Sequence, residues 1–209
     1  MTITGTHYSN LDKAMAYFNK HLFNSELPDV MLTMSRKKNC LGYHHFEKFN
    51  DMNTRLGVNE ISLNPDYFSE RTPEEVLSTL VHEMVHQWHY IVGEPSRKGY
   101  HNKEWGSLMK EIGLYPSSTG EHGGKETGQR MSHYIIEGGD FEKVCGAFLL
   151  KHGNPLLVYS EIVTAEAKEK KKTRDKYVCP TCLTNAWAKP KTKLMCGEDE
   201  VMMIVEEEN

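Results

Sequence analysis

The sequence predicts an α+β fold in which a small antiparallel sheet packs on helices, followed by a small C-terminal module. An apolar helical pattern with clear start and stop signals covers Thr72–Gly93. Three short strand patterns precede it, and their short connections favour antiparallel pairing. Three of the five cysteines lie together at the end of the chain, after a charged segment, and indicate the separate module.

Length and composition agree with this organisation. A chain of 209 residues has room for one ordinary domain and a small module, and it buries a core without disulfides. Hydrophobic residues make up 38% and charged residues 26%, as in globular proteins. The net charge of −4 gives no whole-chain signature of a nucleic-acid-binding protein, although local basic patches remain compatible with it.

The N-terminal sequence lacks the basic start and apolar core of a signal peptide, and no apolar run approaches the length of a membrane span. We therefore expect a cytoplasmic protein without a membrane partner. In that reducing compartment the cysteines are predicted to be free of disulfides. Cys40 and Cys145 stand alone in the sequence and are predicted to be buried thiols.

Before the apolar helix, residues 9–24 have the spacing of an amphipathic helix that begins at Ser9 or Asn10. Three strands are predicted, over residues 30–34, 41–46 and 59–63. His44 and His45 are neighbours in the second strand and point to opposite faces, so they cannot serve one site. We predict structural or surface roles for both.

After the apolar helix, the predicted elements are a helix over 100–112 that stops at Gly113, a loop over 116–128, a strand over 131–137, a helix over 141–151 and a strand over 156–163. The loop is rich in Gly, Ser and Thr and is long enough to be functional. His122, within this loop, is predicted to be exposed and not a metal ligand.

The apolar helix carries the candidate site. Thr72 and Glu75 form a predicted capping box, and Pro73 suits the first helical position. His82 and His86 are four residues apart, so they lie on one face and can bind one metal ion, with Glu83 beside them. A polar trio in a buried helix is costly without compensation, which favours metal binding over two structural histidines.

A catalytic zinc usually has three protein ligands and an open position. His101 is the predicted third ligand, because it begins the next helix after a loop that lets the chain turn back. Glu104 and Glu111 are alternatives on that helix. Glu83 would then act as general base on a metal-activated water and pass the proton to the leaving nitrogen. His133 and Tyr134 are candidate donors to the oxyanion.

Several sequence blocks between Leu11 and Ile162 resemble the SprT-like zinc metalloprotease family, whose eukaryotic branch is called Spartan: FNKHLFNSELPDV, CLGYHH, EISLNPDYF, EEVLSTLVHEMVHQW and GYHNKEW. The spacing between His86 and His101 fits that family, whereas Asn102 stands where members usually have glycine. The resemblance implies a zincin-like metalloprotease domain with one catalytic zinc. It also implies, by analogy, proteolysis of proteins crosslinked to DNA.

The C-terminal module contains a zinc-knuckle pattern. Cys179 and Cys182 are three residues apart, and Cys196 follows. Asp199 occupies the place of a fourth cysteine, so either it completes a Cys3Asp zinc site or the ribbon is degenerate. Zinc binding is favoured because three thiols at this spacing have few other uses in a reducing compartment.

Glu198 and Glu200 are alternative ligands for the C-terminal zinc. SprT-like proteins often end in such a ribbon, and the resemblance supports this interpretation. Trp187 and the lysines at 189, 191 and 193 make the module a candidate nucleic-acid contact.

The predicted organisation is a SprT-like metalloprotease domain over 1–164, a basic linker over 165–176 and a zinc-ribbon-like module over 177–209. The predicted function is a zinc-dependent endopeptidase that acts on proteins or peptides, including DNA-bound ones. The alternative is a nucleic-acid-binding adaptor that contacts DNA through the zinc ribbon and the basic linker, with an inactive or regulatory peptidase fold. Hydrolysis of a small amide also remains open. An intact Glu83 favours the enzyme, because an adaptor has no need of a general base.

Overall fold

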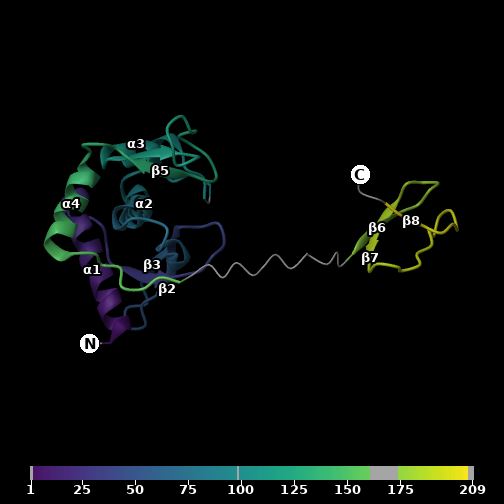
Figure 1. Cartoon of the computed structure of the whole chain (residues 1–209), viewed down its shortest axis with the longest axis horizontal. Coiled ribbons are helices and arrows are strands. Elements are labelled where there is room, and N and C mark those ends of the chain that lie inside the picture. Colours follow the sequence, from purple (N-terminus) through teal and green to yellow (C-terminus); the bar gives the residue numbers. More distant parts are fainter. Residues whose placement is uncertain (1, 98, 161–173, 207–209) are drawn as a thin grey trace. The chain divides into compact units, whose positions relative to one another are not determined.

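A computed structural model describes residues 2–97, 99–160 and 174–206. The chain divides into two compact units, Met1–Ile162 and Val163–Asn209 (Figure 1). Helices and small sheets combine in a mixed α+β architecture, as predicted. Within the described residues, no helix has the length and apolar character to cross a membrane.

Helix α1 (Ile3–Leu22) begins earlier than predicted. Thr2 is the N-cap, and its side chain accepts a hydrogen bond from the Gly5 backbone N–H, so the helix begins at Ile3, ahead of the predicted Ser9. The predicted apolar face is correct: Leu11, Ala14 and Phe18 are buried in the core of the larger unit.

The first sheet contains β1 (Val30–Met34), β2 (Gly42–Asn50) and β3 (Gly57–Leu63), in the order β1-β3-β2. β2 pairs with β3 antiparallel, as expected for neighbouring strands. β1 pairs with β3 in parallel, so the prediction of an antiparallel sheet was wrong for this pair. β3 holds the central position because its residues 59–63 are all buried, which leaves β2 at an edge.

Helix α2 (Pro73–Val92) is the predicted apolar helix, and its capping box is formed by Thr72 and Glu75. It lies at the centre of the larger unit, with β2 and β3 on one side and α3 and β5 on the other (Figure 1). Leu77, Leu80 and Met84 are fully buried. A helix buried on most sides is a rigid base for the side chains of a site.

Helix α3 (Lys103–Glu111) begins after His101, not at residue 100. Asn102 is the N-cap and accepts from the Trp105 N–H, so the residue that departs from the family pattern caps this helix. His101 instead forms an isolated bridge with Gly128. Backbone pairing with Gly128, in the segment that leads into β5, therefore holds the candidate ligand His101 in place.

Strands β4 (Leu114–Ser117) and β5 (Ser132–Ile135) pair antiparallel, and α4 (Asp140–His152) follows. The first two residues of the predicted 116–128 loop thus belong to β4. The predicted strand over 156–163 was wrong for residues 156–160, which form no strand, and its remaining residues lie outside the described part. Cys145 is buried in α4, as predicted.

The second unit is a sheet of β6 (Asp175–Val178), β7 (Asn185–Ala188) and β8 (Ile204–Val205), in the order β7-β6-β8 with antiparallel pairs. Residues 165–173 of the predicted linker lie outside the described part of the chain. Its last two residues are in β6, because Asp175 and Lys176 pair with Ala188 and Trp187.

Candidate metal centre

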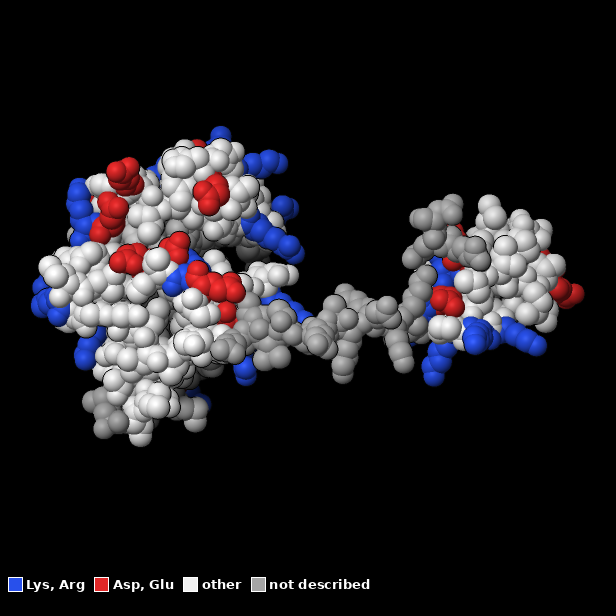
Figure 2. Space-filling model, in the orientation of Figure 1, with Lys and Arg blue, Asp and Glu red and all other residues white. Residues whose placement is uncertain are grey.

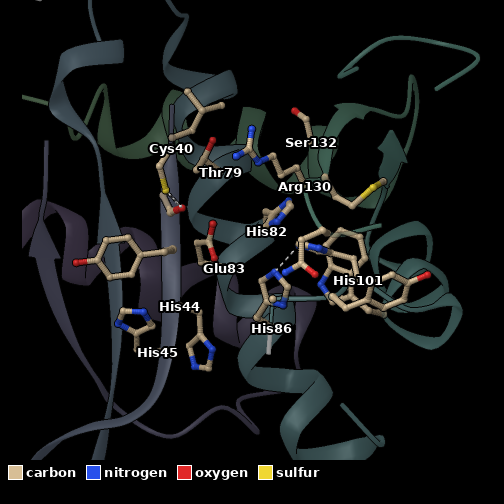
Figure 3. Close-up of a pocket in the computed structure, with 18 of the residues that line it drawn as sticks. Cys40, His44, His45, Thr79, His82, Glu83, His86, His101, Arg130 and Ser132 are labelled. Carbon is tan, nitrogen blue, oxygen red and sulfur yellow. Dashed lines mark hydrogen bonds between the residues drawn. The ribbon is translucent and has the colours of Figure 1, made fainter. Parts of the chain in front are cut away.

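Three histidines converge from two segments of the larger unit. His82 and His86 come from α2, and His101 precedes α3; their candidate ligand atoms all lie within 4.8 Å of one another. The Nε2 atoms of His86 and His101 are 3.1 Å apart. Nitrogens on one tetrahedral zinc lie about 3.3 Å apart, given Zn–N bonds of about 2.0–2.1 Å. Figure 3 shows the three rings turned toward one another.

Trp105 supports this cluster. Its ring is fully buried and packs against the rings of His82, His86 and His101 at centroid distances of 5.0, 5.2 and 4.4 Å. Trp105 stands in the first turn of α3, so this one helix anchors the segment that carries His101.

The three histidine rings are neutral, which suits the binding of a metal cation. Burial lowers the pKa of His82 and His86 well below the ordinary value, and it also lowers the pKa of His101. Nδ1 of His101 donates to the Gly128 carbonyl, because a carbonyl only accepts, and its Nε2 therefore presents a lone pair to the cluster. Neutral imidazoles with inward lone pairs are zinc ligands.

A hydrogen-bond chain orients His82 in the same way. The Ser78 hydroxyl donates to the Glu75 carbonyl, so its oxygen is free to accept from Nε2–H of His133, 2.8 Å away. Nδ1 of His133 is then the acceptor for Nδ1–H of His82 at 3.0 Å. This leaves Nε2 of His82 unprotonated and available to the metal. His133 thus orients the ring of a candidate ligand, and its Nε2–H is engaged by Ser78 instead of being free for the predicted donor role.

We expect His133→Ala to lower zinc affinity by about 10–100-fold, the usual effect of losing a hydrogen-bond partner of a ligand. Zinc competition against a coloured chelator measures it. Tyr134→Phe is the matched control, because Tyr134 stacks on Tyr115 and does not line the cleft. Equal zinc affinity in wild type and His133→Ala would refute the orienting role.

Glu83 lies between the histidines and β2. It is 5% exposed, and burial raises the pKa of its carboxyl to about 8, an effect that a backbone hydrogen bond from His44 partly offsets. Close packing holds it there: a Cβ on Gly42 would lie 2.9 Å from the Ser62 carbonyl and 3.3 Å from Glu83 Oε1. Gly42 therefore lets β2 approach the carboxylate.

This pKa predicts how stability depends on pH. The carboxyl pKa is 4.5 in its ordinary state and about 8 in the folded, metal-free protein, so the folded state holds the proton more tightly. Stability from this group is complete below pH 4.5 and is lost as pH rises toward 8. We expect metal-free Glu83→Gln to gain stability over wild type across this range, by about a few kcal/mol at pH 9.

Urea unfolding of both proteins in EDTA at pH 5, 7 and 9 measures this difference. EDTA strips both candidate metal sites equally in the two proteins, so the comparison isolates Glu83. A stability difference that does not change with pH would contradict the raised pKa.

The site lies in a cleft of about 980 Å³ that β2, α2 and the segments at 95–105 and 129–133 line. His44 lies in this cleft and stacks with His86 at 6.4 Å between ring centroids, so the prediction of a structural or surface role was incomplete. Cys40 is half-buried at the cleft, not in the core as predicted, and its Sγ donates to the Gly42 carbonyl.

The other candidates lie outside the histidine cluster. His45 contacts Glu60, with Nδ1 3.3 Å from Oε2. Glu104 accepts from the His89 ring and from the Glu94 N–H, which removes it as a third ligand. Glu111 is exposed on α3. His122 is exposed, as predicted, and packs on Tyr134 at 4.1 Å.

The second unit brings together Cys179, Cys182, Cys196 and Asp199, whose candidate ligand atoms lie within 4.8 Å of one another. Asp199 Oδ2 is 3.1 Å from Cys179 Sγ and 3.5 Å from Cys196 Sγ. Glu198 and Glu200, the predicted alternatives to Asp199, are not part of this group.

Two equivalent turns place these four residues. In the first, the Leu183 N–H donates to the Cys179 carbonyl and Leu183 has φ 61°. In the second, the Glu200 N–H donates to the Cys196 carbonyl and Glu200 has φ 53°. Asp199 therefore occupies in the second turn the position that Cys182 holds in the first.

Comparisons with known proteins match the larger unit. The model of the SprT-like family matches residues 11–122. Protein SprT of Glaesserella parasuis serovar 5 (strain SH0165) is 34% identical over 110 residues, which are 53% of this chain and 60% of that protein. An uncharacterized protein in the mucB 3' region of Salmonella typhimurium is 37% identical over 54 residues, which are 26% of this chain and 73% of that protein.

The match to Protein SprT thus spans less than two thirds of that protein's length. The family match includes His82, Glu83, His86 and His101, and it ends before His133 and the second unit.

Proposed function

Because the chain belongs to the SprT-like family, we propose that it is a zinc-dependent endopeptidase with a zincin-like domain. The observation that carries this proposal is a buried carboxylate, Glu83, placed beside three convergent neutral imidazoles in an open cleft. A structural metal site has no need of a buried carboxylic base next to its ligands.

In the proposed reaction His82, His86 and His101 hold the zinc. Bound zinc supplies Lewis acidity, which brings the pKa of a water from about 15.7 to about 7 and polarises a carbonyl. Glu83 takes the proton from the attacking water and gives it to the leaving nitrogen. His44 holds Glu83 through its backbone N–H.

A polypeptide substrate is supported by strand β2. It is an edge strand of its sheet, and residues 42–46 line the cleft beside Glu83. An edge strand has backbone N–H and C=O groups that can pair with an extended peptide. This would lay a peptide bond along the cleft, past the histidines.

For the second unit we propose a structural zinc held by Cys179, Cys182, Cys196 and Asp199. The matched turns and the clustered donor atoms support it. Trp187 is 60% exposed on β7 and is a candidate contact for DNA, which we propose as a partner. An adaptor role without catalysis is the second candidate, supported by this ring alone.

Cleavage of an unfolded protein, free or crosslinked to DNA, tests the proposed function. The zinc-loaded full chain is expected to cleave both, and the DNA-linked form faster if the second unit binds DNA. DNA binding without cleavage of either substrate would replace the peptidase with the adaptor.

A further inference from the structure

The charged residues that line the metal cleft are nearly all positive. Five cationic side chains do so: Lys37, Lys38, Lys48, Arg97 and Arg130. Glu83 is the one carboxylate among the described residues that line it. The chain as a whole has a net charge of −4, so this lining is opposite in sign to the molecule. In Figure 2, blue side chains border the hollow of the larger unit.

These cations are available to a ligand. None of the five makes an ion pair with a residue in the described part of the chain. All five side chains are exposed. Two of them rest on aromatic rings of the cleft, Lys37 on Tyr43 at 5.3 Å and Arg97 on Tyr100 at 5.1 Å. Such rings fix the position of a cation without neutralising its charge.

Arg130 lies beside the histidine cluster (Figure 3). It precedes β5, three residues before His133, and Figure 3 shows it next to His82 and Ser132. The lysines come from the opposite wall, in β2 and the turn before it. Positive groups therefore flank the metal centre on both sides of the cleft.

We propose that this cleft selects polypeptide segments with Asp or Glu side chains on either side of the scissile bond. The proposal rests on the peptidase function. A peptide in the cleft presents its carboxylates at intervals, so they can reach the rim while its backbone passes Glu83. A nucleic acid would carry a continuous line of charge past that buried carboxylate, which makes it the less suitable occupant.

Screening by salt determines how strong the preference for acidic peptides is. Exposed charges interact over a Debye length of about 10 Å at 0.1 M salt and about 3 Å at 1 M. Each exposed pair contributes little alone, but several cations of one sign in a cleft add up and raise the local concentration of an acidic ligand. The preference for acidic peptides should therefore be strong at low salt and weak at high salt.

The test uses three unstructured peptides of one sequence that differ only in two flanking positions, which hold Glu, Gln or Lys. We expect kcat/KM to be about tenfold higher for the Glu than for the Lys peptide at about 50 mM salt, and nearly equal at 1 M. The double variant Lys48→Glu/Arg130→Glu should remove most of this preference, because it leaves three cations against two introduced carboxylates. Lys143→Glu, on an exposed part of α4, is the control and should leave it unchanged.

Binding of the same labelled peptides to zinc-loaded Glu83→Gln separates recognition from catalysis. Equal cleavage and equal binding of the three peptides would overturn the acidic preference and leave the peptidase intact. Binding of the Glu peptide without cleavage by wild type would overturn the peptidase only. Stronger competition by a single-stranded oligonucleotide than by the Glu peptide would assign the cations to phosphate instead.

Discussion

Glu83→Gln is expected to reduce peptide cleavage by about 10²–10⁴-fold while the protein keeps its catalytic zinc. This is the usual contribution of a positioned acid–base group. Gln has nearly the same shape, so the packing against Gly42 and the hydrogen bond from His44 can persist. It cannot accept a proton from water, and it cannot return one to the leaving nitrogen.

Cleavage of a fluorogenic unfolded protein, together with zinc content by elemental analysis, measures both halves of this expectation. Glu74→Gln is the control, because Glu74 is exposed in the first turn of the same helix. Glu83→Gln protein that retains its zinc and cleaves at the wild-type rate would rule out the assigned general base.

His101→Ala is expected to lower the affinity of this site for zinc by more than about 10–100-fold. That range is the usual loss when only a hydrogen-bond partner of a ligand is removed. The variant removes one of the three proposed ligands, and it leaves Trp105 to hold the remaining two rings. Peptidase activity should fall with zinc occupancy and recover in part when zinc is supplied in excess.

Glu104→Gln is the matched control for this variant, since Glu104 was the alternative ligand and instead accepts from His89. Its zinc affinity should equal that of wild type. If Glu104→Gln loses zinc and His101→Ala does not, the ligand set is wrong. Zinc titration in competition with a chelator of known affinity distinguishes the two results.

Strong local signals made α2 predictable. Thr72, Pro73 and Glu75 specify where it starts, and its apolar pattern specifies that it is buried, so the sequence alone places His82 and His86 on one face. His101 was predicted as the start of the next helix after a turn of the chain, and its spacing fits the family pattern; it lies just before that helix, and the structure brings it to the other two histidines.

Contacts between distant segments were not predictable in the same way. No local pattern showed that β1 pairs in parallel with β3, because the choice depends on which strand is buried most. His133 lies 51 residues from His82 along the chain, and nothing in its strand pattern indicated the hydrogen bond between them. The sequence puts Asp199 in the place of a fourth cysteine but left its role open, and only the matched turn geometry brings its carboxylate to the three thiols.

Zinc reconstitution tests whether cleavage depends on a zinc held by His82, His86 and His101 beside Glu83. Protein that carries Cys179→Ser is stripped of metal, and peptide cleavage is followed as zinc is added. We expect no cleavage without zinc and recovery that saturates at about one equivalent bound per chain. Cleavage by the stripped protein at the rate of the loaded protein would contradict it.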